Sequence, residues 1–294
     1  MCRGRRAGHD RRDHGALGPG PFRRRPRASC VTGAGRDAGG LMIKRGKAAL
    51  CAVAGAVTLT MAVAPQASAI IGGHDATSPY PFMASVQKDG HHYCGASLIK
   101  RDWLVTAGHC TVGVEPQQLT VRIGDPDRRK GAEAKVTKIV AHPDFSYEPF
   151  RDDVAVMKLD HPVDAQPIKL ADSAPTGTET RILGWGMTCE DGNECPDPPI
   201  RLQELDTEIV PGDRCSENFN KDNELCTDSP VENAQACVLD SGGPQIKGRP
   251  GRWELVGATS RDGDADPKCA TGPGIYTDLT AHRDWIERTT ADGK

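Results

Sequence analysis

Three short segments of the chain contain residue types that together could break an acyl bond. They are TAGHC at 106–110, which offers His109, DDVAV at 152–156, which offers Asp153, and DSGGP at 240–244, which offers Ser241 in a glycine-rich turn. Acyl transfer from a peptide needs a nucleophile, a base that takes its proton and an acid that orients the base. A lone histidine beside a cysteine is usually structural, and a serine in such a loop is usually part of a turn. The three segments in the order His, Asp, Ser are much stronger together, and they predict catalysis by a serine nucleophile.

Strands must position these residues, because the chain after Ile70 consists of short apolar runs broken by Gly, Pro, Asp and Asn. This texture is typical of an all-β protein. One helix is expected at the C-terminus, where Thr280 could cap it and Ala281, Trp285 and Ile286 share a face. Strands are expected at 98–99, 103–105, 119–121, 134–136, 154–157 and 255–256.

The first 69 residues do not have the texture of a fold. Residues 42–69 have the build of a secretory signal peptide: a basic start, a nearly uncharged apolar run at 48–64 and the small residues Ala67-Ser68-Ala69 at its end. The run is short for a membrane span, so we expect cleavage after Ala69 and no membrane anchor. Because a signal peptide must lie near the N-terminus, we expect translation to start at Met42, with residues 1–41 as a mis-called start; the alternative is a disordered basic arm.

The charge of the chain is unevenly distributed. The first 69 residues carry thirteen basic and three acidic side chains, so the net charge of −3 for the whole chain leaves about −13 from Ile70 onward. This balance argues against nucleic-acid binding by residues 70–294 and is typical of a protein kept soluble outside the cell. These 225 residues are enough for one domain with a sizeable core.

The chain from Ile70 to Lys294 resembles the chymotrypsin-like (trypsin family) serine proteases of the secreted bacterial type. The matching stretches, in the family's order, are IIGG at 70–73, TAGHC at 106–110, DVAV at 153–156, GWG at 184–186, DSGGP at 240–244 and GPGIY at 272–276. The resemblance implies an all-β fold of two six-stranded antiparallel β-barrels with a C-terminal helix. It also implies a site in the cleft between the barrels.

The resemblance further implies a role for each residue of the site. Ser241 attacks the scissile carbonyl, His109 serves as base and then as acid, and Asp153 fixes the imidazole tautomer. Asp152 competes for this last role, but it precedes the apolar alternation, where the family more often has an exposed polar residue, so we favour Asp153. Ser260 matches a family serine that helps to hold the aspartate.

Cysteine usage indicates an oxidising compartment. Eight of the eleven cysteines follow Ile70, and an even number behind an export signal predicts disulfides. No Cys-x-x-Cys motif supports a metal site. The other three are Cys2, Cys30 and Cys51, and Cys51 is not expected to carry a lipid. The resemblance pairs Cys94–Cys110, Cys215–Cys226 and Cys237–Cys269, which leaves Cys189–Cys195.

Activation is also implied by the resemblance. In the family, a new N-terminal isoleucine folds inward and its ammonium pairs with the aspartate before the catalytic serine, which here gives Ile70 and Asp240. The expected signal cleavage after Ala69 exposes Ile70 directly. We therefore expect export itself to activate the enzyme.

Four positions depart from the family pattern: Leu239, Gln235, Arg261 and Asp262. The backbone N–H groups of Leu239 and Ser241 are the expected oxyanion donors, but the family almost always has glycine where this chain has Leu239. The expected specificity pocket has Gln235 at its base, where trypsin-like members have an aspartate. A neutral amide offers no charge to pair with Arg or Lys, so cleavage after these residues is not expected. Arg261 replaces the usual aromatic residue, and Asp262 at the pocket mouth could attract a basic side chain or narrow the entrance. The pocket residues expected are Gln235, Ala236, Ser260, Asp262 and Gly274.

We therefore expect a secreted, monomeric serine endopeptidase without trypsin-type Arg/Lys specificity. Its expected partners are protein or peptide substrates, with protein protease inhibitors as further candidates. The alternative is a weakly active or inactive homologue that acts as a binding module, motivated by the departures at the site. No cofactor or metal is expected: His91 and His92 are adjacent, so on a strand they point to opposite faces, and neither shows a ligand pattern with His142 or His161.

Overall fold

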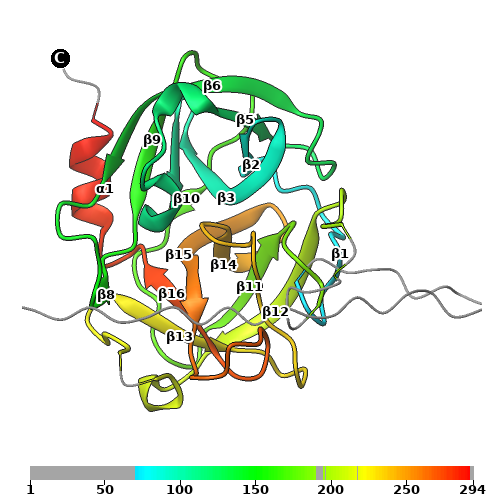
Figure 1. The fold of residues 1–294 in the computed structure, drawn as a ribbon, viewed down its shortest axis with the longest axis vertical. Helices are drawn as coiled ribbons and strands as arrows, with labels where there is room; N and C mark the ends of the chain where they lie inside the picture. Colours follow the sequence, from blue (N-terminus) through cyan, green and yellow to red (C-terminus); the bar gives the residue numbers. More distant parts are fainter. Residues whose placement is uncertain (1–69, 190–194, 196, 217, 292–294) are drawn as a thin grey trace, which may run out of the picture. The chain divides into compact units, whose positions relative to one another are not determined.

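Strands are the main regular secondary structure in the part of the chain that the computed structural model describes, which is residues 70–189, 195, 197–216 and 218–291. They build two barrels, which lie one above the other in Figure 1. The expected signal peptide and the expected N-terminal arm lie outside the described residues. Among the described residues, no helix is long and apolar enough to span a membrane.

The first barrel contains the segment that carries His109. Its six strands close in the spatial order β2-β3-β4-β9-β6-β5, and every neighbouring pair is antiparallel. The strands are β2 (Met83–Lys88), β3 (His91–Lys100), β4 (Trp103–Thr106), β5 (Leu119–Ile123), β6 (Ala132–Ala141) and β9 (Ala155–Leu159).

The second barrel contains the segment that carries Ser241. Its six strands follow the order β12-β11-β14-β15-β16-β13, and a pairing of β12 with β13 closes the ring. The strands are β11 (Glu179–Gly184), β12 (Gln203–Ile209), β13 (Glu224–Asp228), β14 (Pro244–Arg249), β15 (Arg252–Asp262) and β16 (Gly274–Asp278). The predicted fold of two six-stranded antiparallel barrels is confirmed.

Smaller elements complete the described chain. β1 pairs with β12, β10 runs parallel to β15, and β7 pairs with β8 in a separate hairpin. Their bounds are β1 (His74–Asp75), β7 (Ser146–Tyr147), β8 (Phe150–Arg151) and β10 (Lys169–Leu170), and three 3-10 turns are η1 (Gly108–Thr111), η2 (Pro116–Gln118) and η3 (Gly212–Arg214).

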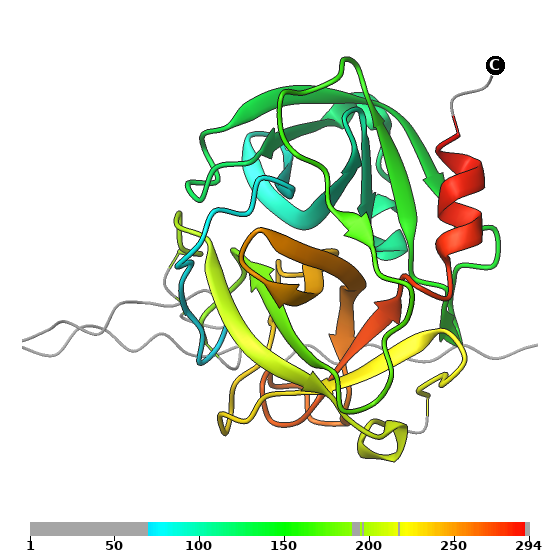
Figure 2. The ribbon, with the colours of Figure 1, turned by 180° about the vertical axis from the view of Figure 1, so that it is seen from behind.

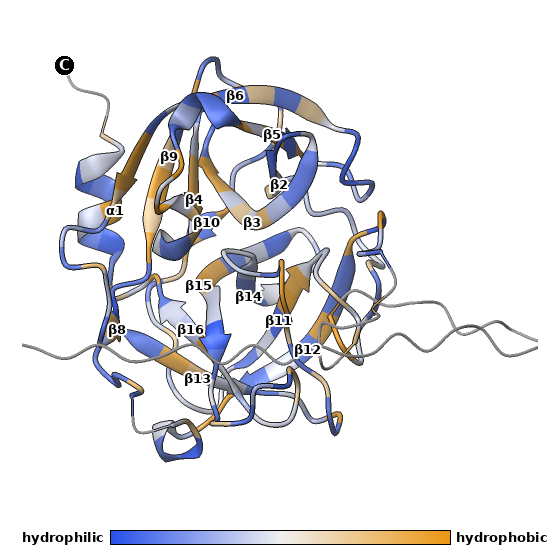
Figure 3. Cartoon of the chain, in the orientation of Figure 1, coloured by the Kyte–Doolittle hydropathy of each residue, from blue (hydrophilic) through white to orange (hydrophobic). Residues whose placement is uncertain are grey.

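The core forms because apolar residues recur on the inward faces of the strands. β5 alternates buried and half-buried residues along Leu119–Ile123, as expected for a strand with one face inside. In β9 only Lys158 is not buried, and Figure 3 shows this strand as largely hydrophobic. Apolar side chains therefore fill most of the core, together with buried polar residues such as Ser85 in the first barrel and Gln245 in the second.

The expected strands were found, but they are longer than the apolar runs that predicted them. The run at 98–99 is part of β3, and the run at 255–256 is part of β15, because neighbouring residues, most of them buried, continue the pairing. The run at 154–157 is shifted by one residue, since β9 begins at Ala155 and Val154 lies just before it.

The predicted C-terminal helix is confirmed as α1 (Arg283–Thr289), the one α-helix among the described residues, and it lies along the side of the barrels in both views (Figures 1 and 2). The predicted cap at Thr280 is wrong. Thr280 donates both its backbone N–H and its hydroxyl to the carboxylate of Asp278, at 2.8 and 2.6 Å, so this segment forms a turn and the helix starts three residues later. Ala281 is therefore exposed outside the helix, whereas Ile286 is buried.

Candidate active site

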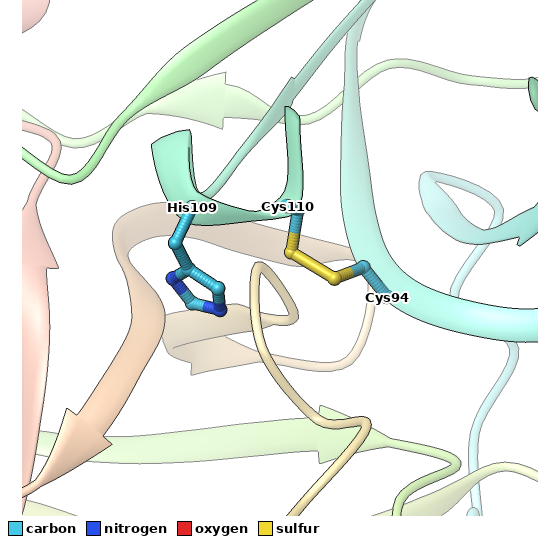
Figure 4. A group of neighbouring side chains, drawn as sticks. All are labelled: Cys94, His109 and Cys110. Carbon is cyan, nitrogen blue, oxygen red and sulfur yellow. A yellow bond between two sulfur atoms is a disulfide. The ribbon is translucent and has the colours of Figure 1, made fainter. Parts of the chain in front are cut away.

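His109 lies on the tight turn η1, directly after β4. A disulfide from Cys110 to Cys94 on β3 fixes this turn beside the imidazole, as Figure 4 shows. The backbone N–H of His109 donates to Asp153 Oδ1 at 2.8 Å, and its Nδ1 lies 2.9 Å from Asp153 Oδ2. Because a carboxylate only accepts, Nδ1 carries the proton and Nε2 presents a lone pair. The ring is therefore oriented as a base.

Asp153 is buried and fully engaged. Its side chain accepts the two bonds from His109, and the hydroxyl of Ser260 donates to its Oδ2 at 2.6 Å. Its backbone carbonyl accepts from the hydroxyl of Thr277 at 2.8 Å. A buried carboxylate without such partners would be costly, so these bonds compensate for its burial and hold it in place.

Asp152 does not contact His109 in the described structure. Its Oδ1 lies 3.0 Å from Nε2 of His282 and accepts from the amide of Asn223 at 2.7 Å. The backbone of Asp152 has φ of +46°, which turns consecutive side chains in different directions. Of the two neighbouring aspartates, the structure therefore places Asp153 against the histidine.

Ser241 belongs to a turn that is fixed against the first barrel. Its carbonyl oxygen accepts from the N–H of Gly95 at 2.8 Å and lies 3.8 Å from Sγ of Cys110. The next residue, Gly242, has φ of +75°, and a Cβ there would overlap Thr106 and Gly95. Only glycine permits this close approach, which brings the serine turn and the His109 turn together.

One cavity of about 150 Å³ opens beside Ser241. Its lining includes all five of the expected pocket residues, which are Gln235, Ala236, Ser260, Asp262 and Gly274. The five residues that the sequence predicted for the pocket thus lie around one cavity. The cavity is the only one described here that is lined by both the candidate nucleophile and these side chains.

The base of this cavity is uncharged and hydrogen-bonded within the protein. Gln235 donates its amide to the carbonyl of Thr227 at 3.1 Å and accepts from the hydroxyl of Tyr276 at 2.6 Å. A Cβ at Gly274 would approach the amide carbon of Gln235 at 2.9 Å, so a glycine makes room for it. Burial, assisted by Asp264, raises the pKa of Asp262 to about 6.

Arg261 is turned away from the cavity base by an ion pair. Its guanidinium binds the buried carboxylate of Glu224 with two hydrogen bonds of 2.7 and 3.0 Å and lies 4.9 Å from the ring centre of Phe150. The bidentate pair and the cation–π contact explain how an arginine replaces the aromatic residue expected at this position.

Leu239 has the strained backbone that the sequence suggested. Its φ is +76°, in the left-handed region where glycine is preferred. Its carbonyl lies 3.1 Å from Nε2 of His92, and the hydroxyl of Ser85 lies 2.8 Å from Nδ1 of the same ring. Burial is the main cause that lowers the pKa of His92 to about 4, so the ring is neutral near pH 7 and its Nε2–H donates to the Leu239 carbonyl.

Sequence reasoning did not identify His92 as part of the site. The available signal was the prediction that His91 and His92 point to opposite faces of a strand, and the structure confirms it, with the first exposed and the second buried. A histidine on the inward face needs polar partners, and the chain supplies them from Ser85 and from Leu239.

Asp240 and Ile70 are both buried. The carboxylate of Asp240 accepts from the N–H groups of Gly186 at 2.7 Å and Cys237 at 3.0 Å, and a Cβ at Gly184 or Gly186 would overlap it. Burial raises the pKa of Asp240 to about 7 despite these two bonds. Ile70 has φ of +63°, an unfavourable conformation for a β-branched residue.

The structure joins the cysteines in the four pairs that the resemblance implied. They are Cys94–Cys110, Cys189–Cys195, Cys215–Cys226 and Cys237–Cys269. Two of them hold the functional turns, since the first fixes the segment of His109 and the last fixes the segment before Ser241.

Two antiparallel barrels with a buried Asp–His pair beside a serine turn define the class of serine endopeptidases with a Ser-His-Asp arrangement. Comparison with known proteins agrees. The sequence model of the family described as Trypsin matches residues 70–286. The chain is 32% identical to Trypsin epsilon of Drosophila erecta over 82% of this chain and 95% of that protein. It is 36% identical to Trypsin theta of Drosophila melanogaster, over 74% of this chain and 84% of that protein. A Trypsin of Saccharopolyspora erythraea is 33% identical, over 73% of this chain and 95% of that protein.

The chain therefore belongs to the Trypsin family. It is a serine endopeptidase, and its substrates are peptides or proteins.

Proposed function

We propose that Ser241, His109 and Asp153 form the catalytic triad of this endopeptidase. The observation that carries this proposal is the fixed tautomer of His109, whose Nδ1–H donates to a buried carboxylate at 2.9 Å. His109 Nε2 takes the hydroxyl proton as Ser241 Oγ attacks the scissile carbonyl. The same proton then passes to the leaving amine as the peptide C–N bond breaks. Water, deprotonated by His109, hydrolyses the acyl-enzyme and regenerates the serine.

Replacement of the nucleophile tests this assignment. Ser241→Ala is expected to lower kcat on a peptide substrate by at least about a thousandfold with the fold unchanged. Wild-type turnover in this variant would overturn the assignment. The intact contact between His109 and Asp153 favours catalysis over the alternative of an inactive binding module.

The oxyanion of the tetrahedral intermediate is expected to accept hydrogen bonds from the backbone N–H groups of Leu239 and Ser241. The left-handed backbone of Leu239, φ +76°, supports this proposal, because this conformation normally requires glycine and persists only where the surroundings hold it. The bond from His92 to the carbonyl of Leu239 fixes the same peptide segment.

We infer that the mature enzyme begins at Ile70, after signal cleavage behind Ala69, and that its ammonium pairs with Asp240. Two features support this. Burial raises the pKa of Asp240 to about 7, and no cation among the described residues pairs with its carboxylate. The positive φ of Ile70 is defined by the preceding carbonyl, so cleavage before this residue removes the strain. Edman sequencing of secreted, active protein tests the inference, and any start upstream of Ile70 contradicts it.

The cavity beside Ser241 is proposed to prefer neutral side chains over Arg or Lys. The uncharged amide of Gln235, already satisfied by Thr227 and Tyr276, supports this preference. Asp262 at the cavity wall is the one carboxylate among the described lining residues. A peptide-library cleavage profile tests the proposal, and dominant cleavage after Arg or Lys at pH 8 contradicts it.

Secretion as a monomer is proposed from the four disulfides and from the expected signal peptide. Extracellular proteins, and protein protease inhibitors that fill the same cavity, are the proposed partners. The bacterial type rests on the resemblance and on the Saccharopolyspora erythraea relative. Fractionation of the producing cells tests secretion, since active enzyme confined to the cell pellet contradicts it.

A further inference from the structure

A second group of titratable side chains lies outside the proposed triad. His142 follows β6, Asp152 follows β8, and His282 precedes α1, and Figures 1 and 2 both show the start of α1 close to β8. Each residue offers one ligand atom, and these three atoms all lie within 4.8 Å of one another. His282 is buried, and the other two are half-buried. Neither the proposed chemistry nor the proposed activation uses this group.

The contact between His282 and Asp152 is not satisfied as an ordinary hydrogen bond when the imidazole is neutral. His282 Nδ1 lies 2.8 Å from the backbone carbonyl of Asp278, which only accepts, so this nitrogen carries a proton. In the neutral ring, Nε2 then presents its lone pair to Asp152 Oδ1, an acceptor at 3.0 Å. Two acceptors at this distance repel one another unless a proton or a metal ion lies between them.

We propose that His142, Asp152 and His282 form a binding site for a divalent transition-metal ion of the Zn²⁺ class. Two imidazoles and one carboxylate are a common ligand set for this ion, and a fourth position remains for water. Metal–ligand distances of about 2.1 Å in a tetrahedral site separate the ligand atoms by about 3.4 Å. The 3.0 Å contact and the 4.8 Å limit bracket this value, so small side-chain movements complete the site.

The residues around His282 and Asp152 hold these two ligands in orientation, whereas Nδ1 of His142 accepts from the N–H of Asp144 at 3.3 Å, so this ring must turn to ligate. The Asp278 carbonyl fixes the tautomer that leaves Nε2 of His282 free to ligate, and Asn223 holds Asp152 through a 2.7 Å bond to Oδ1. The ring of Trp285 on α1 packs against the ring of His142, with centres 4.9 Å apart. Such outer partners are typical of metal sites and raise their affinity.

The other described group with metal-ligating side chains does not form a site. It consists of Cys94, Cys110 and His109, but the two sulfur atoms are joined in a disulfide (Figure 4) and Nδ1 of His109 donates to Asp153. The separation of 130 residues between Asp152 and His282 explains why the sequence pattern did not predict the cluster.

A bound ion would tie together three segments beside the proposed triad. Asp152 directly precedes Asp153, and its carbonyl accepts from the N–H of Val154 at 2.7 Å. The N–H of His142 donates to the carbonyl of Val154 at 2.9 Å. The ion thus links α1 to the chain on both sides of Asp153, and we expect it to raise the unfolding temperature of the protein.

Zinc titration of the full-length chain by isothermal calorimetry tests the proposal. The His142→Gln/His282→Gln variant is expected to bind one Zn²⁺ fewer than wild type, and Asp152→Asn, which keeps the side-chain shape, to bind it at least about tenfold more weakly. Histidines and cysteines in the first 69 residues are common to all variants and cancel in the comparison. Ca²⁺, which prefers oxygen ligands, is expected to show no difference between the variants.

Two controls make the result decisive. His91→Gln, at an exposed histidine, is expected to leave Zn²⁺ binding unchanged, and His109→Ala is expected to retain the site. Thermal unfolding in EDTA identifies the variants that fold as wild type does. If the His142→Gln/His282→Gln variant does not fold, the comparison rests on Asp152→Asn. An equal number of sites and equal affinity in wild type and these variants overturns the proposal. Loss of the site with His109→Ala instead also overturns it.

Discussion

The buried histidine His92 makes the stability of this protein depend on pH in a way that a single substitution removes. Burial lowers its pKa from the ordinary value of 6.5 to about 4. The unfolded chain therefore takes up a proton as the pH falls through 6.5, whereas the folded protein stays neutral at this residue until about pH 4. The stability that His92 contributes is complete above pH 6.5 and is lost as the pH falls toward 4.

The size of this effect follows from the shift in the pKa. Integration of the two titrations between about pH 7.5 and pH 5 gives a loss of about 2 kcal/mol in the free energy of unfolding, out of about 3 kcal/mol for the whole shift. His92→Gln removes the titrating group, so its stability is expected to fall by about 2 kcal/mol less than that of wild type over the same interval.

Urea denaturation at the two pH values measures the difference. A Ser241→Ala background prevents self-digestion in both proteins. His91→Gln is the matched control, because His91 is exposed. This variant is expected to keep the pH dependence of the wild-type stability. If His92→Gln and wild type lose the same free energy between the two pH values, the assignment of His92 as a buried neutral group is wrong.

Three further substitutions test the surroundings of the site. Leu239→Gly removes about 1–2 kcal/mol of left-handed backbone strain but costs about 0.4–1 kcal/mol, because glycine raises the entropy of the unfolded chain. The free energy of unfolding, measured by urea denaturation, is therefore expected to rise by about 1 kcal/mol, and a decrease contradicts the strain. Ser260→Ala removes a 2.6 Å bond to the proposed triad carboxylate and is expected to lower kcat about tenfold, and an unchanged kcat contradicts this positioning role. Arg261→Ala leaves the buried Glu224 unpaired and is expected to cost about 3 kcal/mol of stability, whereas Arg214→Ala, which breaks an exposed pair, costs less than about 1 kcal/mol; equal costs contradict the argument.

The residues proposed to do the chemistry were predictable because each sits in a local pattern. His109, Asp153 and Ser241 lie in short segments of fixed composition, and the order of these segments along the chain is specific. Strand positions followed from apolar runs for a similar reason, since burial of one face leaves a local trace. The fold was therefore accessible from the sequence, while the assignment of the specificity pocket stays a prediction.

The resemblance implied the contact of Ser260 with Asp153 and the Cys94–Cys110 disulfide, but other contacts that fix these residues were not predictable, because they join positions that are far apart. His92 and Leu239 are separated by 147 residues, and no local sequence pattern near either residue predicts the hydrogen bond between them. The prediction of where α1 starts failed for a different reason. The carboxylate of Asp278 accepts from the backbone N–H and the hydroxyl of Thr280, so these groups are not available to start the helix. Side-chain competition of this kind depends on geometry that composition does not encode.

Labelling of the folded enzyme with a fluorophosphonate, followed by peptide mass mapping, tests the central claim most directly. The reagent requires a serine that is activated by its histidine, so wild-type protein with Ile70 at its amino terminus is expected to carry a single adduct on Ser241. His109→Ala and denatured protein are expected to carry none. Folded wild-type protein without an adduct on Ser241, or with the adduct on another residue, would contradict the catalytic assignment.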